Sequence, residues 1–378
     1  MSPVIFSELV TGNNKKIAIA ELNSPQSLNA LSMNMIELLL QKLLLWQADD
    51  EVVMVLLQGA GDKAFCAGGD VVSLYHSLEV KDEQSSIAHF PFVDDQNIVD
   101  SLAHDFFTKE YQLDQLIHEF TKPILVWGDG YIMGGGIGLF AGASHRVVTE
   151  KSLLAMPEIT IGLYPDVGAS WFLNKIPNSI GLFLGLTGVV FNAVDALNIG
   201  LANNAIKSDF KDEILLHLSK VSWTNKEENF KLLDEILAHY TKTSLQAFEL
   251  IESNIEQHWK LISRLFESDN IVSSYNALIA LETNSDWLQS AQVKLKKGSP
   301  LSAMIIYQQL QRSKNYSLAE CFLSELNLSL RCCQYPEFSE GVRALLVDKD
   351  KKPQWAYNHI EDIPAELLDW FFTPIKNL

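Results

Sequence analysis

The sequence predicts an α/β fold in its first half and an α-helical region after it. Buried strands and amphipathic helices alternate to about residue 205, which is typical of an α/β unit with right-handed crossovers. From Lys211 onward the apolar residues recur at helical spacing. We therefore expect a core over residues 1–208 and a helical region over residues 209–378.

Apolar runs of strand length predict four buried strands in the first half. They cover Ile17–Leu22, Val52–Leu57, Pro123–Trp127 and Arg146–Thr149, and the first ends at a turn signal, Asn23–Pro25.

Helices are predicted between these strands from caps and apolar spacing. Ser32 can cap a helix that runs through Met35 to Leu45. Leu113, Leu116, Ile117 and Phe120 form one face of another helix, and the glycine triplet Gly134–Gly136 opens a third. Residues 80–100 are polar and acidic, so we expect a surface loop there.

The helical second half also carries boundary signals. Ile214, Leu215 and Leu218 lie on one helix face, and Leu232, Leu233, Ile236 and Leu237 lie on another. One helix is predicted to end at Lys294–Gly298, where cations precede a glycine. The next is predicted to begin with Ser299 as N-cap and Pro300 at its first position.

Composition restricts the class of protein. The chain has 378 residues, 47% of them hydrophobic, and a net charge of −18. This charge argues against nucleic acid and anionic membrane surfaces as partners, although helix N-termini or a local basic patch can still receive phosphates. No apolar stretch reaches transmembrane length and no secretory signal is visible, so we expect a cytoplasmic protein; a processed organellar form would look the same.

The four cysteines give neither a disulfide framework nor a metal-ligand spacing. They are Cys66, Cys321, Cys332 and Cys333. We expect reduced, mostly buried thiols.

Two carboxylates in apolar surroundings are the most informative feature. Glu158 follows Met156-Pro157, and Asp166 follows Pro165. Apolar burial raises the pKa of a carboxyl group, and two nearby groups pushed apart in pKa can divide acid and base roles. The alternatives are an N-cap or a surface salt bridge for Glu158, and an N-cap of the helix through Val167–Leu173 for Asp166.

Two glycine-rich runs accompany the acids. Phe65–Asp70 and Met133–Gly138 each place small residues at a predicted strand-to-helix junction, where backbone N–H groups are unpaired. Two such groups that converge on one oxygen would form an oxyanion hole, worth on the order of 10²–10³ in rate per donor. The alternative is that the glycines only permit tight turns and close packing.

Other catalytic patterns are poorly supported. Gly136–Ala141 fits a G-x-G-x-x-A dinucleotide pattern, but Gly128–Met133 separates it from the strand that should precede it. No G-x-S-x-G elbow is present, which disfavours a serine hydrolase. His89, His104, His118 and His145 have no metal spacing and are expected to be structural or solvated. The lysines around Asp348 and Asp350 are expected to form a solvated turn.

Taken together, these residues resemble the crotonase (enoyl-CoA hydratase/isomerase) superfamily, and within it the 3-hydroxyisobutyryl-CoA hydrolase branch. The resemblance rests on Asn23–Pro25 with Leu28–Leu31, Ala64–Asp70, Met133–Gly138, Ala155–Glu158 with Pro165–Gly168, and, far downstream, Phe338–Ala344 with Asp348–Asp350 and Pro353–Trp355. It covers nearly the whole chain.

The resemblance implies a core of stacked ββα turns in a spiral, an extended helical C-terminal region and an acyl-CoA thioester as ligand. The oxyanion hole would be the N–H groups of Gly69 and Gly135. Glu158 would be the catalytic glutamate, attacking the carbonyl or acting as general base on water. Asp166 would orient the substrate hydroxyl or the attacking group, and Glu110 would be a further substrate-contacting acid.

One departure discriminates within the superfamily. Hydratases carry a glutamate two residues after the glycine triplet, and this chain has Gly138 there. The sequence therefore favours hydrolysis of a short branched 3-hydroxyacyl-CoA, with 3-hydroxyisobutyryl-CoA from valine breakdown as first choice. The alternatives are an enoyl-CoA hydratase or isomerase and a non-catalytic acyl-CoA-binding protein.

The resemblance requires no cofactor beyond the CoA of the substrate and no metal. It allows a homo-oligomer, because crotonases commonly assemble through C-terminal helices; the longer helical region here could instead cover that surface within one chain.

Overall fold

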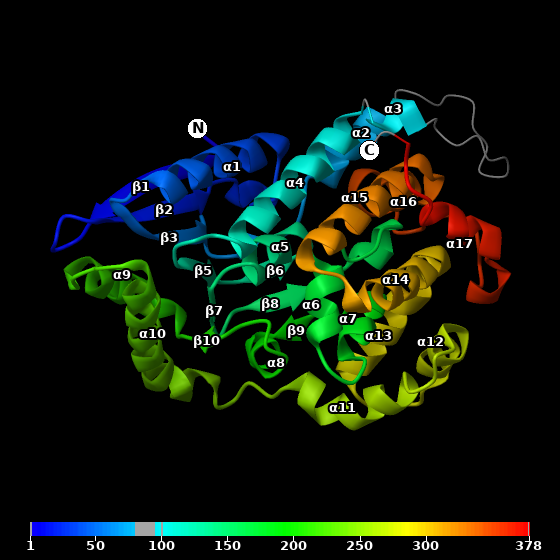
Figure 1. Cartoon of the computed structure of the whole chain (residues 1–378). Helices are drawn as coiled ribbons and strands as arrows, with labels where there is room; N and C mark the ends of the chain where they lie inside the picture. Colours follow the sequence, from blue (N-terminus) through cyan, green and yellow to red (C-terminus); the bar gives the residue numbers. More distant parts are fainter. Residues whose placement is uncertain (1, 80–94, 100, 377) are drawn as a thin grey trace. The chain divides into compact units, whose positions relative to one another are not determined.

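The computed structural model describes residues 2–79, 95–99, 101–376 and 378, and Figure 1 shows the course of the chain. The chain divides into two compact units. The first comprises Met1–Gly69, Gln112–Leu154 and Val190–Gln257; the second comprises Asp70–Tyr111, Ala155–Val189 and His258–Leu378. The expected boundary between residues 208 and 209 stays a prediction.

A six-stranded sheet forms the centre of the first unit. Its strands lie in the order β1 (Val4–Val10), β2 (Lys16–Leu22), β3 (Val52–Gly59), β5 (Ile124–Gly128), β7 (His145–Val148) and β10 (Asn204–Ala205). β1 is antiparallel to β2, and the other neighbours are parallel. The four predicted strands are confirmed as β2, β3, β5 and β7, whereas β1 and β10 were not predicted.

The two faces of this sheet are covered by different helices of the first unit. Phe6 of β1 contacts Trp46 of α1 (Met33–Ala48), with ring centroids 5.5 Å apart. Leu9 lies three residues after Phe6, so its side chain points to the other face, where it joins the core formed with α9 (Lys211–Lys220) and α10 (Lys226–Phe248). Ser32 caps α1 as predicted, since its side chain accepts a hydrogen bond from the N–H of Met35.

The core beneath α9 and α10 is apolar throughout. It joins residues of the sheet to the predicted helix faces, and its buried members include Ile17, Met54, Leu56, Trp127, Ile214, Leu218, Leu233, Ile236 and Leu237. The predicted periodicity of these two helices is therefore confirmed.

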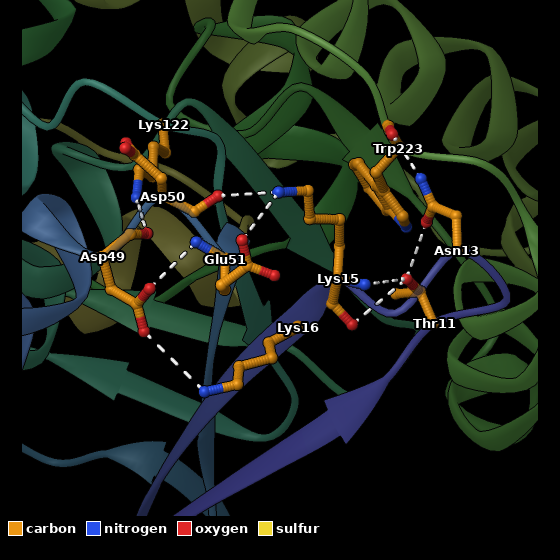
Figure 2. Close-up of polar contacts among 9 residues, drawn as sticks. All are labelled: Thr11, Asn13, Lys15, Lys16, Asp49, Asp50, Glu51, Lys122 and Trp223. Carbon is orange, nitrogen blue, oxygen red and sulfur yellow. Dashed lines mark hydrogen bonds and ion pairs between the residues drawn. The ribbon is translucent and has the colours of Figure 1, made fainter.

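Polar contacts hold the β1–β2 hairpin against the end of α1. Lys15 forms an ion pair with Glu51 at 3.0 Å, and Lys16 forms one with Asp49 at 3.8 Å. Figure 2 shows both contacts. Lys122 donates hydrogen bonds to the carbonyl groups of Trp46 (2.8 Å) and Asp49 (2.5 Å). These carbonyls lie at the C-terminal end of α1, where a cation is favourable.

A second, smaller sheet was not predicted, and all of its residues except Ala155 belong to the first unit. Its strands lie in the order β4 (Ala64–Cys66), β6 (Tyr131–Met133), β8 (Leu153–Ala155) and β9 (Phe191–Asn192). β4 and β6 are parallel, so their carboxyl ends point in the same direction.

The remaining helices of the first unit are α5 (Gly135–Ala141), α8 (Ala193–Asn198), α9 (Lys211–Lys220) and α10 (Lys226–Phe248). The helices of the second unit are α2 (Val71–Glu79), α3 (Asp95–Val99), α6 (Ala169–Lys175), α7 (Ile180–Thr187), α12 (Ile271–Ala280), α13 (Asp286–Lys297), α14 (Pro300–Arg312), α15 (Leu318–Gln334), α16 (Pro336–Val342) and α17 (Ala365–Phe371). α4 (Leu102–His118) and α11 (Asn254–Leu265) contribute residues to both units.

Several predicted boundaries can be compared with these helices. α13 ends at Lys297, and Ser299 caps α14 by accepting a hydrogen bond from the N–H of Ser302, as predicted. α4 begins well before the predicted apolar face. In the expected surface loop, Asp95–Val99 forms α3 instead, while residues 80–94 and 100, with His89, lie outside the described residues.

No helix in the described part of the chain combines the length and apolarity needed to cross a membrane.

Candidate active site

Three acids predicted for the site form one buried cluster in the second unit. Glu110 lies on α4, Glu158 begins a 3-10 turn (Glu158–Ile161), and Asp166 lies in the loop before α6. Their side chains are 2%, 5% and 5% exposed. The charge of Asp166 acts on both glutamates, so the three carboxyl groups share one electrostatic environment. We call Glu110, Glu158 and Asp166 the acid cluster.

Glu158 has the environment expected of a reactive carboxyl group. Burial raises the pKa of Glu158 well above its usual range, and repulsion from Asp166 and Glu110 raises it further. The Lys294 ammonium lowers that pKa again. The Oε2 atom of Glu158 is buried and has no hydrogen-bond partner among the described residues. This oxygen is therefore available to a substrate or a water molecule.

Asp166 is held differently. Burial raises the pKa of Asp166 to about 6, although the Tyr111 hydroxyl, 2.6 Å from Oδ2, opposes that rise by donating a hydrogen bond. Burial also raises the pKa of Glu110 well above its usual range, and the charge of Asp166 adds to this. The pKa of Asp166 rises less than that of Glu110, because a hydroxyl group donates a hydrogen bond to Asp166.

The loop after Asp166 has an unusual backbone. Val167 has a φ of 55° and Gly168 a φ of 86°, so two consecutive residues are left-handed. This conformation is costly for a β-branched residue and persists only where the surroundings enforce it. Gly168, not Asp166, is the N-cap of α6, so the capping alternative for Asp166 is wrong.

A buried glutamate of α15 enforces this turn. The Glu325 carboxylate accepts hydrogen bonds from the N–H groups of Gly168 (2.7 Å) and Ser170 (2.9 Å) and from the Ser170 hydroxyl. It thus satisfies donors at the start of α6 that a capping side chain would otherwise satisfy. Burial raises the pKa of Glu325 to about 8, and these donors limit that rise.

The turn that carries Glu158 is packed against α16 backbone to backbone. A Cβ atom on Gly162 would lie 2.3 Å from the carbonyl oxygen of Glu337, and one on Gly341 would lie 2.4 Å from the carbonyl carbon of Ile161. Two glycines therefore permit this contact. Because Glu158 is buried behind it and follows the N-cap Pro157, both the surface-salt-bridge and the N-cap alternatives for Glu158 are wrong.

The two predicted oxyanion glycines lie in the first unit, at the same ends of adjacent strands. Gly69 follows β4 and Gly135 follows β6, and β4 and β6 are parallel neighbours. Gly134 takes a φ of 50°, and a Cβ atom on Gly136 would lie 2.3 Å from the carbonyl oxygen of Cys66. Within the described residues, the N–H groups of Gly69 and Gly135 donate no hydrogen bond. Both are available to an external oxygen, and their catalytic role stays a prediction.

The other expectations concern structural residues. All four cysteines are free and buried, as predicted. His145 contacts Ser144 and Asp234, a structural role. Among the described residues, no group of three or more His, Cys, Asp or Glu side chains is arranged to hold a metal ion.

The C-terminal signature forms a salt-bridge cluster. Arg343 pairs with Glu340, Asp348 and Asp350, at 2.6 to 2.8 Å. The expected solvated turn is thus anchored by an arginine, while Lys349 and Lys351 are exposed with positive φ.

Asp166 is contacted or braced by four residues of the second unit that were not predicted from the sequence. They are Tyr111, Tyr164, Glu325 and Ser329. Tyr164 directly precedes the motif Pro165–Gly168, and Glu325 lies on a helix whose neighbouring positions Cys321 and Phe322 are apolar. A charged residue on an apolar helix face was the available signal.

Comparisons with known proteins agree with these motifs. The family model "Enoyl-CoA hydratase/isomerase" matches residues 17–372. The chain is 33% identical to "3-hydroxyisobutyryl-CoA hydrolase, mitochondrial" of Gallus gallus, over 95% of this chain and 87% of the relative. It is 36% identical to the protein of that name of Dictyostelium discoideum, over 94% and 89%.

A solved structure has the same fold. An enoyl-CoA hydratase from Rhodobacter sphaeroides superposes with a TM-score of 0.81 and 27% identity, over 99% of this chain and 98% of that one. The expected crotonase fold is thereby confirmed. The chain belongs to the enoyl-CoA hydratase/isomerase family.

Proposed function

We propose that this protein hydrolyses 3-hydroxyisobutyryl-CoA to 3-hydroxyisobutyrate and CoA, the reaction that the names of its curated relatives describe. The observation that carries this proposal is the acid cluster. It contains a second acid at Asp166, and Gly138 stands where hydratases of the family carry a glutamate. Hydration needs two carboxylates on one water molecule, whereas thioester hydrolysis needs one.

The proposal assigns the chemistry to Glu158. Its carboxylate either attacks the thioester carbonyl, forming a mixed anhydride that water then cleaves, or removes a proton from the attacking water. In both routes the C–S bond breaks and the sulfur leaves as CoA thiolate, which takes up a proton. The Oε2 atom of Glu158, which has no hydrogen-bond partner among the described residues, supports this role.

The remaining predicted residues bind and orient the substrate. The free N–H groups of Gly69 and Gly135 would receive the thioester oxygen as it gains negative charge. Asp166 would accept a hydrogen bond from the 3-hydroxyl group, which favours hydroxylated acyl groups. Glu110 would contact the substrate as well.

The reaction needs water and substrate, and the proposal includes no further cofactor. Both relatives reported above are named as mitochondrial proteins. The cytoplasmic location of this chain, its avoidance of nucleic acid and anionic membranes, and its state of assembly stay predictions.

The decisive test is release of free CoA thiol from 3-hydroxyisobutyryl-CoA. Wild-type protein should cleave this ester faster than it hydrates crotonyl-CoA, and Glu158→Gln should lower kcat by roughly 10²–10⁴-fold. Glu366→Gln, an exposed position on α17 of the same unit, is the matched control and should retain full turnover.

Two results would count against the proposal. Faster hydration of crotonyl-CoA would identify a hydratase, an activity suggested by the name of the Rhodobacter structure. Tight binding of CoA esters without turnover of any thioester in a panel would identify a non-catalytic binding protein.

A further inference from the structure

A chain of hydroxyl groups connects Asp166 to a backbone carbonyl of α15. The Tyr111 hydroxyl lies 2.6 Å from Oδ2 of Asp166 and 2.6 Å from the Ser329 hydroxyl. The Ser329 hydroxyl lies 2.9 Å from that of Tyr164, and the Tyr164 hydroxyl lies 2.7 Å from the carbonyl oxygen of Glu325. All four contacts have the length of an O–H···O hydrogen bond. We call Tyr111, Ser329 and Tyr164 the hydroxyl chain.

The hydroxyl chain has fewer protons than contacts. Three hydroxyl groups supply three protons, and each proton can be donated in one contact at full strength. The Glu325 carbonyl at one end can only accept. If Asp166 at the other end is ionised, it too can only accept, and one of the four contacts has no proton. Two oxygen atoms would then face each other at hydrogen-bond distance without a hydrogen between them.

The tyrosines do not deepen this shortage by losing protons of their own. Burial raises the pKa of Tyr111 and of Tyr164 well above the usual range, so each keeps its proton. All the side chains involved are buried, with Tyr111 3%, Tyr164 1% and Ser329 0% exposed. A buried polar group that lacks its hydrogen bond lowers the stability of the folded state by about 1–3 kcal/mol.

A fourth proton on Asp166 satisfies every contact. Asp166 then donates to Tyr111, Tyr111 donates to Ser329, Ser329 donates to Tyr164, and Tyr164 donates to the Glu325 carbonyl. We propose that the hydroxyl chain keeps Asp166 protonated in the resting protein, so that Tyr111, Ser329 and Tyr164 act as positioning residues for that proton.

The proton on Asp166 has a consequence for Glu158, and this step rests on the proposed function. A negative charge on Asp166 raises the pKa of Glu158. With Asp166 neutral, Glu158 can ionise at lower pH and serve as the single charged carboxylate. The other oxygen of Asp166 stays available to accept a hydrogen bond from the 3-hydroxyl group.

Several other groups surround the acid cluster. Within the described part of the second unit, the titratable or charged side chains that act on Asp166, or respond to its charge, are Glu110 and Tyr111 of α4, Glu158, Tyr164, and Glu325, Cys332 and Cys333 of α15, with Lys294 of α13 acting on Glu158. Most are acids or neutral hydroxyl and thiol groups, so they favour the protonated form of Asp166.

The direction of the Tyr111 contact decides the acidity of Asp166. While Tyr111 donates, it lowers the pKa of Asp166, which burial raises to about 6. When the chain runs in the other direction, Tyr111 accepts the proton of Asp166, and the same contact raises that pKa instead.

The test measures the carboxylic acid band of Asp166 by infrared difference spectroscopy of the full chain across pH 5 to 9. Loss of the band in Asp166→Asn assigns it. In the wild type we expect the band to persist above pH 7. In Tyr164→Phe and in Ser329→Ala, the remaining hydroxyl groups supply one proton for each remaining contact even when Asp166 is ionised. The band should therefore disappear about one pH unit lower than in the wild type.

The rate profile should move in the opposite direction. In both variants the ionised Asp166 raises the pKa of Glu158, so the acid limb of kcat/KM moves up by about one pH unit. Below that limb kcat/KM falls about tenfold, while the plateau above it is unchanged. A purely structural role would lower the rate at every pH without moving the limb.

Tyr307→Phe is the matched control. Tyr307 lies in the same unit and its hydroxyl donates to the carbonyl of Asp269, so neither band nor limb should move. Absence of the wild-type band at pH 7, or no shift in either variant, would overturn the proposal. The infrared experiment uses no substrate, so it tests the proton on Asp166 even if no thioester is cleaved.

Discussion

Replacing Glu325 tests how the loop of Asp166 is held. Its carboxylate accepts two backbone N–H groups and one hydroxyl, from Gly168 and Ser170, and is 0% exposed. In Glu325→Ala these donors stay buried and lose their acceptor, at about 1–3 kcal/mol for each backbone group. For the two backbone groups together this amounts to about 2–6 kcal/mol. We expect a loss of that size in the free energy of unfolding.

The isosteric change Glu325→Gln keeps the shape of the side chain and alters one of its contacts. In Glu325→Gln the amide oxygen can still accept from Ser170, but the NH₂ group faces the N–H of Gly168. One contact becomes repulsive while the others remain, so we expect a smaller loss of about 1–3 kcal/mol. Glu325→Ala should also lower kcat/KM more than Glu325→Gln, because the left-handed turn after Asp166 is released.

Urea unfolding at pH 7, followed by circular dichroism, measures these losses. Leu323→Ala is the control, because Leu323 lies on the same helix and is 64% exposed. That variant should stay within about 0.5 kcal/mol of the wild type. A loss of less than about 1 kcal/mol in Glu325→Ala would show that the Glu325 side chain is not what holds the turn.

Two further predictions concern α16. Burial raises the pKa of Glu337 to about 7, so between about pH 4.5 and 7 the folded protein binds a proton that the unfolded chain does not. The stability that this proton confers is fully present below about pH 4.5 and is lost as the pH rises through 7. In Glu337→Gln this pH-dependent loss, about 3 kcal/mol between pH 4.5 and 8, should be absent. A plot of Tm against pH should then be flatter than for the wild type, and an unchanged slope would contradict the prediction. Gly341→Ala places a Cβ atom 2.4 Å from the backbone of Ile161, and we expect a loss of about 2 kcal/mol or more in stability with a lower kcat for CoA release. Gly12→Ala, where the nearest atom lies 3.4 Å away, is its control and should behave as wild type.

The larger elements could be predicted because their signals are long. β2, β3 and β5 each contain a continuous apolar run, and α10 repeats its apolar face over several turns. The second sheet consists of strands of two or three residues, such as β9, and so short a run has no measurable periodicity. Its order depends on pairing between distant segments, which a single sequence does not display.

The sequence identified the acids of the site, but not the residues that surround and hold them. Pro157 and Pro165 mark the loops of Glu158 and Asp166, and burial confirms that both carboxyl groups lie in the interior. The capping interpretation of Asp166 failed because the left-handed Val167 moves the start of α6 beyond its reach. Glu325 lies 159 residues farther along the chain, so local pattern could not connect it with that turn.

The contact between Gly162 and α16 also has a consequence for how the protein is made. The turn of Glu158 is closed by a helix that begins at Pro336, near the C-terminus. During synthesis the chain emerges from its N-terminus, so most of the protein is available to fold before this helix exists. Until it docks, one side of the turn faces water, and the acidity of Glu158 should be closer to that of an ordinary glutamate. A nascent or truncated chain that ends before Pro336 would therefore fold much of its structure yet lack a competent active site.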